Sequence, residues 1–225
     1  MNTNKSKSIL FIVTSCNNIT DSEATGLWLE EFTIPFTEFK ARGFQVSVAS
    51  IQGGEAPIDP RSAPSPEQEQ DWAEAISALQ QTRPVASITH DEFQGVFMPG
   101  GHGTMFDFPS NHHLQNLLRA FATNNKVIAA VCHGPSCLVG VTLEDGASLV
   151  AGKRVTGFTN DEEAAAGLTD KMPFLLESRL RALGADFVAQ ANWSDHVEID
   201  ANLITGQNPQ SSRSAARAMI ESLLN

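Results

Sequence analysis

Residues 126–135, KVIAAVCHGP, carry the strongest structural signal in this chain. The apolar run at 126–131 predicts a buried strand, and residues 136–140 predict a short apolar helix directly after it. Cys132 therefore falls at a sharp strand-to-helix turn, which is the geometry of a nucleophile elbow. The N-terminus of the helix would point backbone N–H groups at the sulfur, so we expect a cysteine that favours the thiolate. The alternative interpretation is a small buried apolar side chain, as most free cysteines are.

Strands and helices alternate around this turn along the whole chain. Repeated strand–helix–strand units predict an α/β fold with a doubly wound, mainly parallel sheet flanked by helices, and with its site at the carboxyl ends of the strands. Pro35 lies inside the first helix and should bend or interrupt it. We expect strands at 8–14, 44–50, 95–99, 126–131, 153–158, 186–191 and 202–205, and helices at 26–42, 65–81, 111–125, 171–183 and from 211.

The length of 225 residues fits a single domain, 1–225, with one core. Residues 51–66 are rich in Pro, Gly and Ser, so we expect the segment 51–87 to be a small cap or insertion. The net charge of −11 argues against nucleic acid and anionic membranes as partners, and no apolar run is long enough to span a bilayer. Three cysteines, an odd number, suit a reducing cytoplasm. The basic start at 1–7 precedes an apolar run of only strand length, so we expect no signal peptide.

Polar residues follow two of the predicted strands, where the carboxyl edge of the sheet should lie. Gly100 and Gly101 form a glycine-rich turn with His102, which can point backbone N–H groups at an oxyanion or can be no more than a tight turn. The acidic pair Glu162 and Glu163 follows another strand. A carboxylate there can orient the imidazole of His133, although acids that complement the dipole at a helix start are the simpler alternative.

Glu30 and Glu31 lie among apolar residues of the first predicted helix. If one of them faces inward beside a thiol, burial would raise its pKa and suit it to act as a general acid or base. Two solvated helix acids are the simpler alternative. His90, His112 and His113 show no spacing typical of metal ligands, so we expect no metal site.

Taken together and in this order, the motifs resemble the ThiJ/PfpI superfamily, which has a flavodoxin-like, class I glutamine amidotransferase-like fold. The resemblance is closest to its glyoxalase III and heat-shock-chaperone-like branch, and it covers nearly the whole chain. The residues that carry it are Thr25-Gly26 with Glu31 and Pro35, residues 99–103, residues 129–135, residues 156–159 with Glu163, and residues 192–212.

The resemblance implies a role for each matching residue. The implied catalytic residues are Cys132, His133, Glu31 and Glu163, and the implied oxyanion or substrate-binding residues are Gly100, Gly101 and His102. Cys132 matches the nucleophile, and Glu31, rather than Glu30, matches a buried acid beside it. Glu163 is the best match for the third member of the triad, with Glu162 one position away.

The implied activity is a cofactor-free, lyase-class conversion of methylglyoxal to lactate through a Cys132 hemithioacetal and an enediol. The implied partners are a small reactive carbonyl compound and a second copy of the chain in a homodimer. Three alternatives use the same cysteine: a cysteine peptidase or amidase, a stress chaperone, and a redox sensor. Cys16 and Cys137 are further thiols, of which Cys137 should point away from the site. Phe106, Phe108 and Trp193 are candidates for pocket walls or for ordinary core packing.

Overall fold

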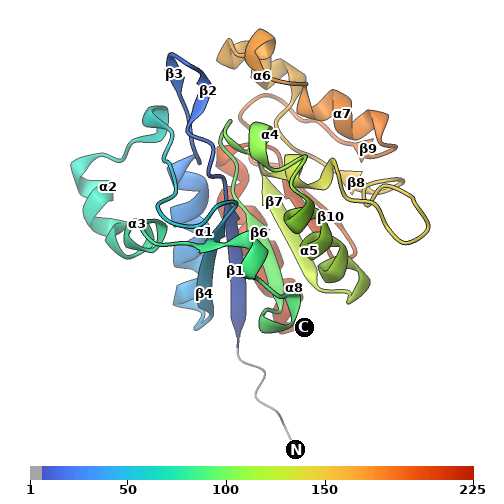
Figure 1. Cartoon of the computed structure of the whole chain (residues 1–225), viewed down its shortest axis with the longest axis horizontal. Coiled ribbons are helices and arrows are strands. Elements are labelled where there is room, and N and C mark those ends of the chain that lie inside the picture. Colours follow the sequence, from blue (N-terminus) through green and yellow to red (C-terminus); the bar gives the residue numbers. More distant parts are fainter. Residues whose placement is uncertain (1–6) are drawn as a thin grey trace, which may run out of the picture.

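The computed structural model describes residues 7–225, so the basic start at 1–6 lies outside the described residues. A seven-stranded sheet forms the centre of the molecule, with strand order β10-β11-β7-β6-β1-β4-β5 (Figure 1). All neighbouring strands are parallel except β10, which is antiparallel to β11. The predicted α/β class is therefore confirmed. The strands are β1 (Ser8–Val13), β4 (Gln45–Ser50), β5 (Arg83–Pro84), β6 (Gly95–Met98), β7 (Val127–Val131), β10 (Val197–Asp200) and β11 (Leu203–Gly206).

Helices cover both faces of the sheet, and the alternation of side chains along β1 shows how. Ile9, Phe11 and Val13 pack with α1 (Leu29–Ala41) and α8 (Ser212–Leu224) on one face. Leu10 and Ile12 pack on the other face, which α5 (His112–Thr123) covers. Because both faces are buried, β1 is a continuous apolar run, as is usual for a parallel strand.

Helix α1 runs through Pro35 without the interruption that the sequence suggests. Phe32, Phe36 and Phe39 of this helix form edge-on or tilted ring contacts with one another or with Phe11 of β1. This aromatic packing offsets the backbone hydrogen bond that a proline removes from a helix interior.

The segment 51–87 lies along one edge of the sheet. Ser65 caps its first helix through a capping box, and the helix predicted at 65–81 is two helices that meet at Trp72, α2 (Pro66–Asp71) and α3 (Ala73–Leu79). The segment then contributes β5, the edge strand next to β4. It is therefore tied to the sheet as well as flanking it.

Short elements gather near the carboxyl ends of the strands, at the top of Figure 1. They are β2 (Asn18–Thr20), β3 (Glu23–Ala24), α4 (Thr104–Asp107), α6 (Asn160–Ala166) and α7 (Leu176–Ala182). The strands predicted at 153–158 and 186–191 form a separate two-stranded sheet, β8 (Arg154–Val155) with β9 (Asp186–Phe187). The 3-10 helices are Pro60–Ser62, Val85–Ser87, His90–Glu92, Gly134–Leu138, Thr169–Lys171 and Pro209–Ser211. Among residues 7–225, no helix has the length and apolar character needed to cross a bilayer.

Candidate active site

Cys132 lies at the end of β7, where the chain turns into the 3-10 helix Gly134–Leu138. Its backbone φ is +58°, a left-handed conformation that is costly for a residue with a side chain. Cys132 is 4% exposed and lines a cavity of about 230 Å³. The predicted elbow is therefore present, and the strained backbone turns the sulfur toward this cavity.

Glu31 approaches the cysteine from the first turn of α1 and is fully buried. The Gly100 N–H donates to Glu31 Oε2 at 2.7 Å, whereas Oε1 has no hydrogen-bond partner among the described residues. Burial raises the pKa of Glu31 to about 8, against the lowering effect of Cys132 and of the Gly100 N–H. Glu30 beside it is only partly buried. The inward-facing acid of the pair is thus Glu31, and it carries a proton at neutral pH.

The expectation that Cys132 favours the thiolate is wrong for the resting site. Burial and then the charge of Glu31 raise the pKa of the Cys132 thiol well above its ordinary value. The 3-10 helix that follows has only five residues, so its dipole is small beside these two effects. The thiol must give up its proton to a neighbouring base before it can act as a nucleophile.

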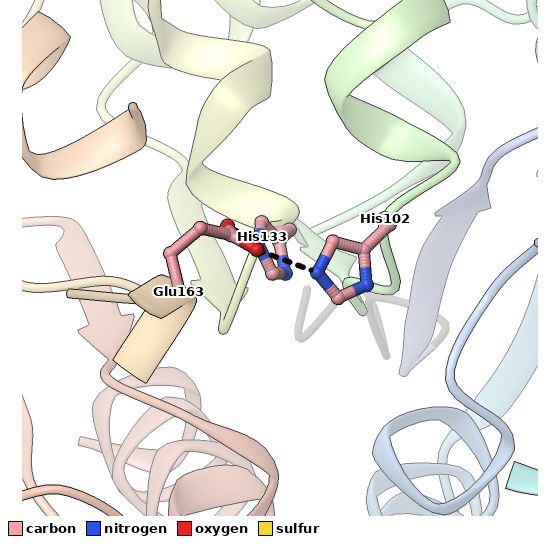
Figure 2. Close-up of side chains that lie close together, drawn as sticks. All are labelled: His102, His133 and Glu163. Atoms are coloured by element: carbon pink, nitrogen blue, oxygen red, sulfur yellow. Dashed lines mark hydrogen bonds and ion pairs between the residues drawn. The ribbon is translucent and has the colours of Figure 1, made fainter. Parts of the chain in front are cut away.

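An imidazole lies within reach of the thiol, since His133 Nδ1 is 3.3 Å from Cys132 Sγ. On the other side of the ring, His133 Nε2 lies 2.7 Å from Glu163 Oε2. Glu163 belongs to the first turn of α6 and also contacts His102, whose Nε2 is 2.9 Å from Oε1. Figure 2 shows the two imidazoles meeting at this one carboxylate.

Glu163 is a carboxylate held between two donors. Burial alone would raise its pKa, but the hydrogen bonds from His102 and His133 outweigh that effect and hold the pKa well below the usual range. Burial and the neighbouring His133 ring lower the pKa of His102 to about 4, so His102 is neutral at physiological pH. The two rings are 4.1 Å apart between centroids.

The same three side chains form the one group in residues 7–225 that offers three close metal-ligand atoms. One atom each from His102, His133 and Glu163 lies within 4.8 Å of the other two. In this arrangement, however, both Nε2 atoms are used in hydrogen bonds to the carboxylate. A metal ion would have to replace the proton on each of them.

The structure corrects the expected role of Gly100. Its N–H is already bonded to Glu31, so it is not an oxyanion donor. Gly101 lines the cavity, and among the described residues its N–H has no hydrogen-bond acceptor, so it is free to meet a substrate oxygen. His102 lines the cavity as predicted, but its ring is engaged by Glu163.

Glu162 is separate from this network and is also fully buried. Its Oε2 accepts from Thr159, which closes the capping box of α6. Its Oε1 accepts from the backbone N–H of Trp193 at 2.8 Å and from the side chains of Gln207 and Asn208. Of the two acids, Glu163 is the one that contacts His133, whereas Glu162 holds the late loop in place.

Other candidates from the sequence lie away from the cavity. Cys16 is partly exposed and its Sγ points at the Asn18 carbonyl, while Cys137 is buried in the core and burial raises its pKa. Phe106 and Phe108 pack in the core. By contrast, the indole of Trp193 lines the cavity, as the pocket-wall interpretation predicts.

Sequence reasoning missed several cavity residues, among them Trp28 and Arg61. Trp28 directly precedes α1, and Arg61 comes from the 3-10 helix Pro60–Ser62 in the segment predicted as a cap. The signal in the sequence was Asp59-Pro60, because a capping residue followed by proline marks the start of a helix. That start sets the backbone conformation at the next residue, Arg61. The cavity is lined by Trp28, Arg61, Gly101, His102, Cys132, His133, Phe158, Ala166, Trp193 and Pro209.

The fold and this site together define a class of protein. A sequence model of the DJ-1/PfpI family matches residues 22–222, and the chain belongs to that family.

Among curated relatives, the glutathione-independent glyoxalase HSP31 of Saccharomyces cerevisiae is 32% identical, with 97% of this chain and 99% of that protein covered. Glyoxalase 3 of Candida albicans is 28% identical over 94% of this chain and 96% of that protein. The crystal structure of glyoxalase III from Candida albicans superimposes with a TM-score of 0.88 at 27% identity, covering 96% of both chains. The X-ray structure of the 24 kDa Rapid Encystment Protein of Francisella tularensis gives a TM-score of 0.92 at 35% identity, covering 97% of this chain and 99% of that chain.

Proposed function

We propose that this protein is a glutathione-independent glyoxalase that converts methylglyoxal to lactate without a cofactor. The observation that carries the proposal is the placement of Cys132, which lines the cavity, between two proton-transfer groups. His133 Nδ1 lies 3.3 Å from the sulfur on one side. The Glu31 carboxyl, with one unpartnered oxygen, lies close enough on the other side for each group to shift the other's pKa. Relatives that match nearly the full chain bear the names of such enzymes.

The first step is addition of the thiol to the aldehyde carbon. As sulfur attacks, the thiol proton moves to His133 Nδ1, and Glu31 protonates the former aldehyde oxygen. The product is a hemithioacetal on Cys132, with His133 protonated and Glu31 ionised. The Gly101 N–H is free to hold the oxygen on which negative charge develops.

The second stage moves one hydrogen from the aldehyde carbon to the ketone carbon. The Glu31 carboxylate removes the C–H proton while His133 protonates the ketone oxygen, which gives an enediol. Glu31 then returns its proton to the second carbon, and His133 takes the hydroxyl proton from the first. The first carbon is thereby oxidised to a thioester and the second is reduced to an alcohol, so no external oxidant or reductant is needed.

Hydrolysis completes the cycle. Glu31 takes a proton from water as the oxygen attacks the thioester carbon, the C–S bond breaks, and His133 returns the proton to sulfur. The sum is one methylglyoxal and one water consumed and one lactic acid formed. Each of the two groups ends in the protonation state in which it began.

The walls of the cavity favour a small neutral carbonyl compound over a polypeptide. At about 230 Å³ the space suits a metabolite, and Trp28, Phe158 and Trp193 give it apolar walls. Of the charged groups at its edge, the Glu163 carboxylate is bonded to two histidines and Arg61 is paired with Asp59. Because these charges are compensated locally, they offer little attraction to a charged substrate.

The test is lactate formation from methylglyoxal in the absence of glutathione. Cys132→Ala and Glu31→Gln should each abolish turnover, and the matched variant Glu30→Gln, whose side chain is partly exposed, should keep it. Wild-type protein that forms no lactate would overturn the proposal. Turnover that survives Glu31→Gln would instead remove Glu31 from the mechanism.

Two further expectations concern assembly and compartment. The family resemblance implies a homodimer, which sedimentation of the purified protein checks. We also expect the enzyme to work in a reducing cytoplasm, because its nucleophile is a free thiol that an oxidising compartment would inactivate.

A further inference from the structure

We propose that Trp193 is a specificity-determining residue of this site. Its indole is the apolar contact for the substituent on the ketone carbon of the substrate, and the substrate class extends to glyoxals whose alkyl substituent is longer than methyl. The inference rests on the proposed function for the identity of the substrate. The apolar contact itself acts on any reagent that brings an alkyl chain to Cys132.

The cavity changes character between its buried end and its mouth. Cys132 and His133, which act on the carbonyl groups, are buried. Three lining residues are exposed, and they mark the end that opens to solvent: Arg61, Ala166 and Trp193. Two of these are apolar, and the guanidinium of Arg61 is paired with a buried carboxylate. The reacting groups therefore lie at the buried end, and the free surface of the mouth is apolar.

The proposed chemistry determines which part of the substrate faces each end. The aldehyde carbon must reach Cys132 Sγ, and the ketone oxygen must reach His133, whose Nδ1 is 3.3 Å from that sulfur. Both carbonyl groups then occupy the buried end, and the substituent on the ketone carbon extends toward the mouth. Methylglyoxal has only a methyl group there, so it leaves much of a cavity of about 230 Å³ unfilled. A longer alkyl chain would cover the indole of Trp193 and displace water from it.

The backbone at Trp193 is held by hydrogen bonds that do not involve the indole. Its φ is +64°, a left-handed conformation that is unfavourable for a bulky residue and persists only where the surroundings enforce it. The buried Glu162 carboxylate accepts from the Trp193 N–H at 2.8 Å, and Asn208 Nδ2 donates to the Ser194 carbonyl at 2.9 Å. The main chain is thus fixed at Trp193 and at the residue after it.

The indole itself contributes little to the core. It is 43% exposed, whereas Phe158, which it contacts, is buried. The two ring centroids are 5.6 Å apart at an interplanar angle of 60°, and Phe158 also lines the cavity. This contact holds the indole against the wall of the cavity. An exposed aromatic ring on a strained and firmly anchored backbone suits contact with a ligand better than it suits core packing.

The first series of measurements is kcat/KM for methylglyoxal, ethylglyoxal and propylglyoxal, which differ by one methylene group at each step. It compares the full-length wild type with Trp193→Ala, Trp193→Phe and the matched control Ile199→Ala. Ile199 is also a large exposed apolar side chain, at 57%, but it does not line the cavity.

The second series needs no turnover. Iodoacetamide and its N-ethyl and N-butyl derivatives alkylate Cys132, and mass spectrometry of the Cys132 peptide separates this reaction from alkylation of Cys16 and Cys137. Each rate is divided by the rate of the same reagent with free cysteine, which removes differences in intrinsic reactivity.

In the wild type and in Ile199→Ala, kcat/KM should rise about two- to fourfold per methylene group, mainly through KM, because the indole binds the chain equally in the ground state and the transition state. The corrected alkylation rate should rise with chain length in the same way. Trp193→Ala should lose the dependence on chain length in both series and keep its kcat for methylglyoxal within about twofold of the wild type. Trp193→Phe, which retains a ring, should fall between the two.

A wild type that is alkylated no faster as the chain lengthens would overturn the inference, whether or not any variant folds. An undiminished dependence on chain length in a folded Trp193→Ala would overturn it as well. So would faster reaction of the longer chains in Trp193→Ala than in the wild type, since the indole would then be a barrier. If alkylation behaves as expected but no glyoxal is converted, the glyoxalase proposal fails and the contact at Trp193 stands.

Discussion

The substitution Glu163→Gln tests the proton arrangement at its centre. The amide keeps one acceptor oxygen but replaces the other oxygen with an NH2 donor. In this variant the Arg61 guanidinium, whose Nη2 lies 3.1 Å from His102 Nδ1 and can only donate, keeps the proton of His102 on Nε2. The amide oxygen therefore turns toward His102, and the NH2 group faces His133. His133 then carries its proton on Nδ1, which points at the thiol and no longer accepts the thiol proton.

The size of the effect follows from the hydrogen bonds involved. To regain the native tautomer, His133 must give up the bond from the amide and place its own N–H against another donor. Two hydrogen bonds to a charged group, at roughly 1.5–3 kcal/mol each, amount to about 3–6 kcal/mol of lost transition-state stabilisation. That corresponds to a turnover roughly 10²–10⁴-fold slower.

The assay is the initial rate of lactate formation at pH 7, with the alkylation rate of Cys132 measured in parallel. The matched control is Glu92→Gln, which removes an exposed carboxylate paired with Arg83 and should leave both rates unchanged. A folded Glu163→Gln protein within about threefold of the wild type in both rates would refute the reasoning.

Three further predictions concern the stability of the fold. Glu31→Gln should remove a pH dependence of stability. Because burial raises the pKa of Glu31 to about 8, the wild type should lose about 1.4 kcal/mol of unfolding free energy per pH unit between the usual glutamate pKa and pH 8. Urea denaturation from pH 5 to 8 should show this slope in the wild type and not in the variant. Gly100→Ala should destabilise the fold by more than about 2 kcal/mol in thermal denaturation, because its Cβ would lie 2.6 Å from the His133 backbone nitrogen and 2.8 Å from the Val131 backbone oxygen. The control Gly157→Ala, whose Cβ would have its nearest atoms at 3.4 Å, should cost less than about 1 kcal/mol. Glu38→Gln should lower the unfolding free energy by about 2 kcal/mol at pH 7, since the buried carboxylate accepts from Arg42, Arg213 and Arg217. These bonds hold the pKa of Glu38 below the usual range, so the wild type loses this stabilisation as the pH falls. The unfolding free energies of the two proteins should therefore become equal in acid.

The sequence was sufficient for the features that depend on local pattern. The apolar run before Cys132 is β7, an interior strand that ends at the site, and the break after it is the turn with positive φ. Ser65-Pro66 and Asn111 begin helices as their chemistry predicts. The short strand β10 has a polar, half-exposed composition and lay outside every predicted strand, because an edge strand lacks the apolar signal.

The site could be predicted only where the chain itself sets the geometry. Cys132 and His133 are neighbours, so their contact follows from the turn, and the choice of Glu31 came from the family resemblance. The contact between Arg61 and His102 joins residues 41 positions apart and depends on how one loop packs against α1. No pattern in either segment therefore predicts it. The expected thiolate was wrong for a related reason: the helix after Cys132 was visible in the sequence, but the depth of burial that raises the pKa of the thiol was not.

The first turn of α6 has a consequence for anyone who wishes to redesign this protein. Its two adjacent acids face different tasks, since Glu162 anchors the loop that carries Trp193 and Glu163 binds both histidines. The position of the Trp193 loop, which shapes the cavity, and the position of the two histidines therefore both depend on this one helical turn, and a change to one is expected to affect the other. Transplanting the Trp193 loop from a relative to alter substrate choice should succeed only when residues 159–163 travel with it.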